Sequence, residues 1–199
     1  MDLPADDPLL LAAPPTALDE FVREPMPEHV IAEFRAAARL PNHLVWHVAR
    51  HEAAHVVVAL AYGLQVGAVR LWNTAQAPAG VTVAHDIDLG DKDAFRSYLD
   101  FAVAGFAWEG MHALAYVRDI NADVTVFKHW NEVYVEDGYA RSTPWQEQRS
   151  LRKALRDATR ILSSRTARAL VHQIAVELLD APELTLDEDA VNTFRRAVA

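Results

Sequence analysis

The chain has 199 residues, of which 51% are hydrophobic and seven are glycine, and its formal net charge is −9. This length and apolar content suit one compact, mainly helical domain, and the acidic balance argues against nucleic-acid binding. Because there is no cysteine, disulfides are excluded and a metal ion would have to be held by His, Asp or Glu. The most apolar stretches contain polar residues and no signal-peptide pattern opens the chain, so we expect a cytoplasmic protein that does not enter a membrane.

The first 40 residues are the least regular part of the sequence. Residues 1–28 are rich in proline and acidic residues, which predicts an arm without a core of its own. A pro-segment, an autoinhibitory strap and a recruitment tag all fit such an arm. A short helix is predicted over 28–40, ending before Pro41.

Residues 41–199 are predicted to form one domain with a metal-binding part, 41–135, and C-terminal helices, 143–199. Its first helix runs from His43 to about Tyr62 and ends at Gly63. The elements expected after it are strands at 66–72 and 80–85, a buried helix over 94–117, a break at 118–123, a helix resuming to 134, one long helix or two joined helices over 143–180, and a last short helix opened by 185–188. The expected fold is mainly α, with a small β element formed by the two strand-like segments.

The segment His51-Glu52-Ala53-Ala54-His55 carries the clearest chemistry. On a helix, His51 and His55 lie on one face, close enough to share one zinc ion. Glu52 is rotated by about 100° around the helix axis, so it can reach a metal-bound water without being a ligand. Zinc acidifies such a water, and a carboxylate can take its proton as the water attacks a carbonyl group. The motif therefore predicts a zinc peptidase with Glu52 as the catalytic base.

A catalytic zinc usually has three protein ligands, and spacing alone does not choose the third. The candidates downstream are His85, Glu109, His112, Asp119, Asp123 and His129. Glu109 lies in an apolar segment, where a buried carboxylate needs a partner, either the zinc or a ligand histidine. His43 and His47 precede the motif at the same spacing but are too distant to share the ion. At most, we expect His47 to contact a ligand side chain without binding the ion itself.

The sequence also contains a pattern that is typical of a different metal site. Glu52-x-x-His55 and Glu109-x-x-His112 match the paired units of di-iron four-helix bundles. Such bundles need a further glutamate from each of two other helices, one of them usually between the pair. No glutamate occurs in residues 53–108. The missing ligand favours the zinc interpretation.

Several segments follow one another in the order found in a known family. They are His51-Glu52-Ala53-Ala54-His55 with the apolar residues after it, Gly80-Val81-Thr82, Ala104-Gly105-Phe106-Ala107-Trp108-Glu109, Asn121-Ala122-Asp123, and an apolar pattern from Ile161 to Leu186. Over residues 45–194 this order resembles the peptidase domain of the FtsH-type zinc metalloproteases. The matching family features are its zinc helix, its Gly-Val-Thr strand, its buried Ala-Gly-x-x-Ala-Glu-Glu helix and its Ser-Asn-Asp segment.

The resemblance implies a helical metallopeptidase domain with a small β-sheet element beside the zinc helix. It also implies that Zn²⁺ is held through His51, His55 and Asp123, with Glu52 as the base. Glu109 would be a neighbour of the ligands or an alternative ligand. The resemblance also implies that substrate binds as an extended strand along an edge formed by Gly80, Val81, Thr82 and Val83.

The sequence departs from the family at several positions. Ala54 and Gly110 stand where the family has Gly and Glu, and Trp108 is bulky where the family has small residues. No Gly-x-x-x-x-Gly-Lys-Ser/Thr motif occurs, so we expect peptides or unfolded protein segments to be cleaved without ATP. The alternative is a non-catalytic, zinc-stabilised adaptor or regulatory module, with a fourth protein ligand or a side chain such as Trp108 filling the cleft. The sequence leaves cleavage specificity and oligomeric state open.

Overall fold

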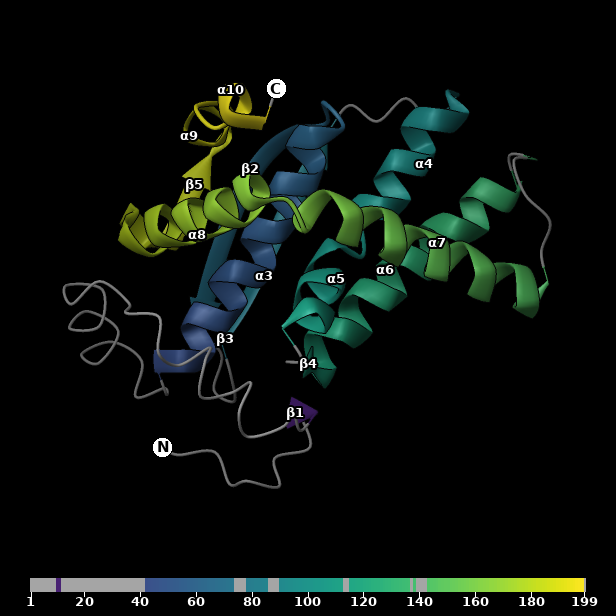
Figure 1. The fold of residues 1–199 in the computed structure, drawn as a ribbon, viewed down its shortest axis with the longest axis horizontal. Coiled ribbons are helices and arrows are strands. Elements are labelled where there is room, and N and C mark those ends of the chain that lie inside the picture. The colour runs from purple at the N-terminus through teal and green to yellow at the C-terminus, as the bar shows by residue number, and fades with distance from the viewer. Residues whose placement is uncertain are drawn as a thin grey trace.

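The computed structural model describes residues 10–11, 42–73, 78–85, 90–112, 115–136, 138 and 143–198, and the predicted helix over 28–40 lies outside them. This part of the chain is mainly helical with a small antiparallel sheet, which confirms the predicted fold class (Figure 1). The helices are α3 (Asn42–Ala61), α4 (Lys92–Phe101), α5 (Ala104–Met111), α6 (Val117–Glu136), α7 (Pro144–Leu162), α8 (Arg165–Asp180), the 3₁₀ turn η1 (Pro182–Leu184), α9 (Glu188–Asn192) and α10 (Arg195–Val198). The strands are β2 (Gln65–Asn73), β3 (Pro78–His85) and β5 (Thr185–Asp187) in the order β3-β2-β5, and β1 (Leu10–Leu11) paired with β4 (Ala115–Tyr116).

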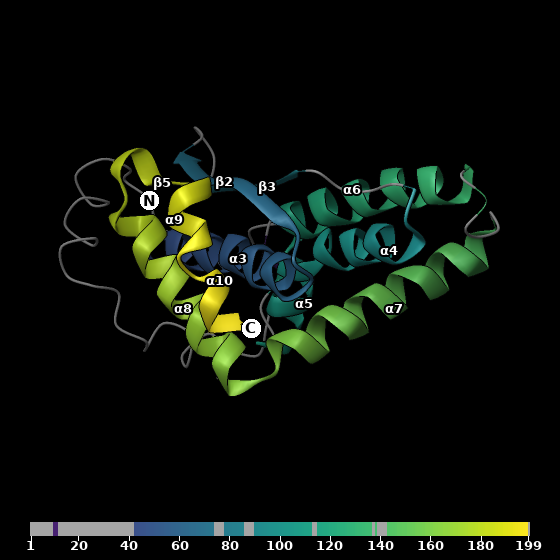
Figure 2. The same ribbon diagram turned by 90° about the horizontal axis from the view of Figure 1, so that it is seen from above.

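Helix α3 is the centre of the fold. All its residues from 45 to 60 are buried, including the polar residues His47, Arg50, His51, Glu52 and His55, so the helix is covered on every side. It lies between the sheet and α8, with α5 packed against it (Figure 2). The helix ends at Gly63, as predicted, where φ is +73°, a conformation that glycine adopts without steric cost.

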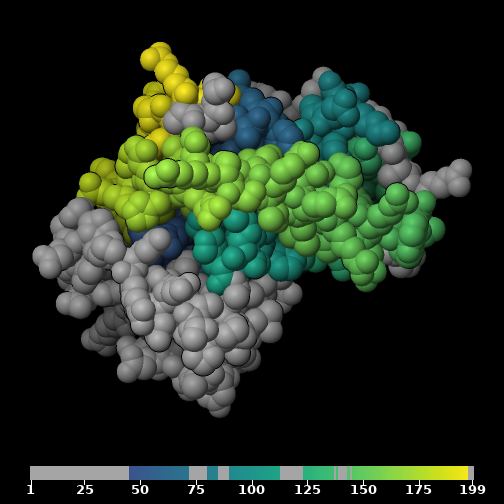
Figure 3. Space-filling model, viewed as in Figure 1, coloured from purple at the N-terminus to yellow at the C-terminus, as the bar shows by residue number. Residues whose placement is uncertain are grey.

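Helices α7 and α8 cover one face of the molecule, running across α3 and α5 (Figures 1 and 3). The predicted cap at Thr143 is confirmed, because its hydroxyl oxygen accepts the Gln146 backbone N–H at 3.2 Å. The chain then forms two joined helices, and the Ser164 side chain caps the second by accepting the Ala167 N–H at 3.0 Å.

Two predicted helix boundaries were wrong. The helix expected over 94–117 is broken at Ala102 and Val103, which separate α4 from α5. The break expected at 118–123 does not occur, because α6 is continuous from Val117 to Glu136. The helix propensities of polar residues differ from those of good helix formers by less than about 1 kcal/mol each, so tertiary packing overrides them.

The segment predicted to open the last helix instead supplies a third strand. Strand β5 pairs antiparallel with β2, with Leu186 opposite Val69, and the Leu186 side chain is buried in the core. The cap of α9 is Asp187, which accepts the Ala190 N–H at 2.9 Å. A three-residue strand is too short to show a recognisable pattern of alternation. Its partner lies more than 100 residues earlier in the chain, so neighbouring residues do not indicate the pairing either.

Within the described residues, no helix is both long enough and apolar enough to cross a membrane.

Candidate metal centre

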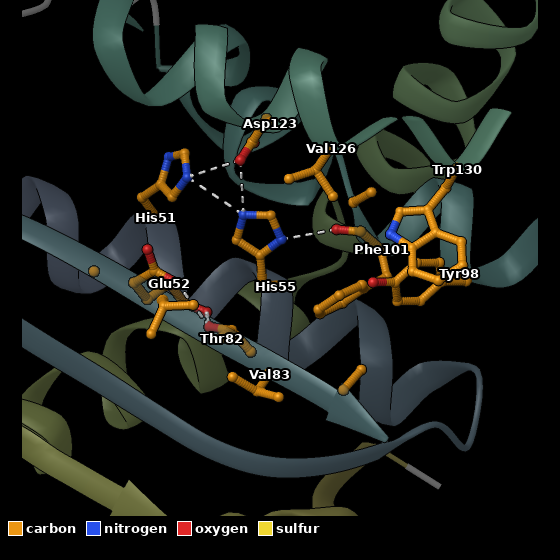
Figure 4. Close-up of a pocket in the computed structure, with 14 residues that line it drawn as sticks. His51, Glu52, His55, Thr82, Val83, Tyr98, Phe101, Asp123, Val126 and Trp130 are labelled. Carbon is orange, nitrogen blue, oxygen red and sulfur yellow. Dashed lines mark hydrogen bonds and ion pairs between the residues drawn. The ribbon is translucent and has the colours of Figure 1, made fainter. Parts of the chain in front are cut away.

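Two histidines from α3 and one aspartate from α6 converge on a common point (Figure 4). The Nε2 atoms of His51 and His55 are 3.3 Å apart. The Oδ1 atom of Asp123 lies 3.4 Å from Nε2 of His51 and 3.3 Å from Nε2 of His55. All three side chains are buried.

The spacing of these three atoms fits a tetrahedral ion. Ligands at about 2.0–2.1 Å from a tetrahedral zinc are separated from one another by about 3.3–3.4 Å. The three measured separations, 3.3, 3.3 and 3.4 Å, match that edge length. His51, His55 and Asp123 can therefore hold one metal ion.

The second ring nitrogen of each histidine is held by an acceptor. Nδ1 of His51 donates to Glu109 Oε1 at 2.7 Å, and Nδ1 of His55 donates to the Phe101 carbonyl oxygen at 2.7 Å. A carbonyl oxygen can only accept, so in neutral His55 the proton is on Nδ1 and the lone pair is on Nε2. Phe101 is the last residue of α4, where a helix leaves carbonyl groups without an internal partner. The break after α4 thus supplies the acceptor that orients His55.

The charges of the site attract a cation. Burial opposes protonation of His51 and His55, but the carboxylate of Asp123 outweighs it, and with Glu109 the pKa of His51 rises well above its usual value. Burial likewise favours neutral Asp123, yet the two imidazoles hold its pKa far below the usual range. When the two Nε2 atoms are deprotonated, the imidazoles and the Asp123 carboxylate present lone pairs to one point, where a metal ion can replace the proton.

Glu109 lies beside the ligands rather than among the converging atoms. Its fully buried carboxylate accepts from Nδ1 of His51 and, at 3.0 Å, from Nε2 of His47. Burial favours the neutral acid, but these hydrogen bonds outweigh it and lower the pKa of Glu109. A carboxylate on the outer nitrogen of a ligand histidine fixes the orientation of the ring and makes it a better ligand. His47 is two turns from His55 and contacts this carboxylate.

The other sequence candidates do not join the group in the described part of the chain. Nδ1 of His112 donates to the Trp108 carbonyl oxygen at 2.9 Å, and His112 does not belong to the described group of potential ligands, His51, His55 and Asp123. His129 is exposed on α6. The side chains of His85 and Asp119 lie outside the described residues.

Glu52 lies next to the converging atoms and is positioned by strand β3. Its Oε2 atom accepts from the Thr82 hydroxyl at 2.7 Å. Burial raises the pKa of Glu52, and His51, His55 and Thr82 only partly offset that rise. Gly80 lies so close that a Cβ atom there would be 2.5 Å from Cγ of Glu52. Gly80 and Thr82, predicted to bind substrate, therefore also shape the position of Glu52.

A cavity of about 390 Å³ opens in front of these groups. Its walls are the three converging residues with Glu52, residues 80–84 of β3, and apolar side chains of α4 and α6. Val81 and Val83 are 41% and 39% exposed at its rim. No described strand pairs with the outer edge of β3. Trp108 is buried in the core and is not part of the cavity wall, so it does not fill the cleft.

Some parts of the site were not predicted. A Cβ atom at Gly105 would overlap the His51 ring, so α5 can approach α3 this closely only with glycine there. Glycine inside an apolar helix was the available signal. Tyr98, Phe101 and Trp130 also line the cavity, and they come from α4 and α6 without any local pattern linking them.

No protein-family model matches the chain, and no curated protein matches it significantly. The resemblance to the FtsH-type peptidase domain therefore stays a prediction.

Proposed function

We propose that this chain is a zinc-dependent metallopeptidase that hydrolyses peptide bonds of peptides or unfolded protein segments without ATP. The observation that carries the proposal is the convergence of His51, His55 and Asp123 in one cavity wall, with the carboxylate of Glu52 beside them. Two imidazoles and one carboxylate are the donor set of many catalytic zinc sites, which keep one position for water or substrate. A di-iron centre needs more carboxylates, and the described residues contain one group of three or more potential ligands.

Glu52 is suited to move a proton in this site. Zinc, when bound, polarises a carbonyl group and lowers the pKa of water. The Thr82 hydroxyl donates to Oε2 of Glu52, so Oε1 would take a proton from the water that attacks the carbonyl carbon and later give it to the leaving amine as the C–N bond breaks. Without a metal ion, burial raises the pKa of Glu52.

The edge of β3 is the expected binding place for substrate. An extended peptide can add to a free strand edge through backbone hydrogen bonds, which do not depend on its sequence. Val81 and Val83 border the cavity on this strand, and exposed apolar side chains beside a cleft are typical of ligand-binding surfaces. Substrates that are already unfolded can supply such a strand.

The test is cleavage of an unstructured protein by the zinc-loaded chain, with and without chelator. Glu52→Gln should retain zinc and lose activity by about 100-fold or more, because it removes the proton acceptor. Glu132→Gln is the matched control, since Glu132 is exposed on α6 and does not line the cavity. Full activity of Glu52→Gln would remove Glu52 from the mechanism. A zinc-loaded chain that cleaves nothing would favour the non-catalytic adaptor.

A further inference from the structure

One end of the cavity is walled by aromatic rings. Tyr98 and Phe101 of α4 and Trp130 of α6 lie next to His55, with Val126 above them (Figure 4). The ring centres of Phe101 and His55 are 5.4 Å apart, those of Tyr98 and Phe101 5.4 Å, and those of Tyr98 and Trp130 5.1 Å. We call these four residues, Tyr98, Phe101, Val126 and Trp130, the aromatic compartment.

The Tyr98 hydroxyl is the one ionisable group of the aromatic compartment, and burial raises its pKa, so the compartment carries no charge at neutral pH. The other ionisable groups of the cavity wall, His51, Glu52, His55 and Asp123, gather at the other end (Figure 4). A charged group placed in the compartment would lose water without finding an opposite charge among the four residues of the compartment.

The compartment adjoins the converging atoms through His55. A carbonyl group bound at those atoms would lie next to His55, whose ring contacts Phe101. Successive Cα atoms of a peptide are about 3.8 Å apart, so the side chain of the neighbouring residue reaches this wall. Trp130, half-buried on α6 and packed across Tyr98, closes the end of the space.

Building on the proposed function, we propose that the aromatic compartment is a specificity subsite. It takes an uncharged, apolar side chain from the substrate residue next to the cleaved bond, and Trp130 sets its depth. Each methylene group buried there strengthens binding by about fourfold. A longer wall side chain shortens the space, so Trp130 determines how large an apolar side chain enters.

The test uses hydroxamates, which chelate a metal and need no turnover. A series carrying a methyl, isobutyl, benzyl or carboxymethyl side chain is titrated calorimetrically into the full chain after its zinc content has been measured. We expect the isobutyl compound to bind at least 10-fold more tightly than the methyl compound, and the carboxymethyl compound to bind most weakly. The affinity for the benzyl compound divided by that for the isobutyl compound should be at least 10-fold higher in Trp130→Ala than in the unmodified chain. Trp130→Leu, which keeps an apolar wall, should shift the same ratio in the same direction by less.

The matched control is Trp145→Ala, because Trp145 is 65% exposed and lies outside the cavity wall. It should leave the ranking unchanged. Equal affinity for all four compounds, or an unchanged benzyl-to-isobutyl ratio in both Trp130 variants, overturns the subsite. Ranked binding without peptide cleavage refutes the proposed function and leaves the subsite, whereas cleavage with no side-chain preference refutes the subsite alone. A chain that takes up no metal refutes both.

Discussion

Replacing Gly80 by alanine should separate catalysis from metal binding. The new methyl group would lie 2.5 Å from Cγ, 2.6 Å from Oε1 and 2.8 Å from Cδ of Glu52. Non-bonded carbon atoms keep about 3.5–4.0 Å apart, so the Glu52 side chain has to move by about 1 Å. That movement disturbs the 2.7 Å hydrogen bond from Thr82 to Oε2.

We expect Gly80→Ala to lower kcat. A displacement of about 1 Å in a catalytic group lowers the rate by about 100-fold, or about 2.7 kcal/mol in the activation free energy. The three nearest contacts of the new methyl group all belong to Glu52 and none to His51, His55 or Asp123. Zinc affinity should therefore stay unchanged. Stability should change little, because the group that yields is the end of a flexible side chain.

The assay is kcat of the zinc-loaded chain on an unstructured peptide, with zinc content and thermal midpoint measured on the same sample. Gly110→Ala is the matched control, since a Cβ atom there meets nothing within 4 Å. This exposed position in α5 should tolerate alanine with full activity and a gain of about 0.5–1 kcal/mol in the free energy of unfolding. Unchanged kcat in Gly80→Ala, or loss of its zinc, would refute the reasoning.

Three further predictions concern the metal and the buried acids. Glu109→Gln removes the negative charge beside His51, so zinc affinity should fall by about 10- to 100-fold in competition with a chromophoric chelator. Removing zinc that is present at 100 times its dissociation constant should cost about 2.7 kcal/mol of stability, which corresponds to a drop of about 5–10 °C in Tm by calorimetry. Asp100 is 2% exposed, and burial raises its pKa although the Tyr62 hydroxyl donates to it at 2.7 Å. Ionising such an acid costs stability as the pH rises above 3.8, its unfolded value, through its folded pKa. Asp100→Asn should therefore gain stability relative to the unmodified chain between pH 4 and 7 in urea unfolding.

A specific result would contradict each of these three predictions. Unchanged zinc affinity in Glu109→Gln would mean that its carboxylate does not support His51. A Tm that is insensitive to chelator would argue against a metal bound by the folded chain. A constant stability difference for Asp100→Asn across that pH range would show that Asp100 titrates alike in the folded and unfolded states.

Local features of the structure could be predicted from the sequence because they depend on neighbouring residues. The helix that carries His51 and His55, its end at Gly63 and the cap at Thr143 each follow from backbone preferences and spacing within a few residues. The two longer strands were also recognised from their patterns. Since the two histidines are one helical turn apart, their common face was determined before any tertiary contact.

The packing of helices that are distant in the sequence decided which acidic residues contact those histidines. From the residues alone six third ligands were open, and only the resemblance favoured Asp123; α6 brings its Oδ1 to within 3.4 Å of both rings. The break after Phe101 and the close approach at Gly105 direct α5 so that Glu109, 58 residues from His51, meets its Nδ1. These contacts have no local signal, because they depend on how α4, α5 and α6 pack against α3. The sequence by itself therefore determined the helix and its two histidines, and the tertiary structure decided their carboxylate partners and the cavity around them.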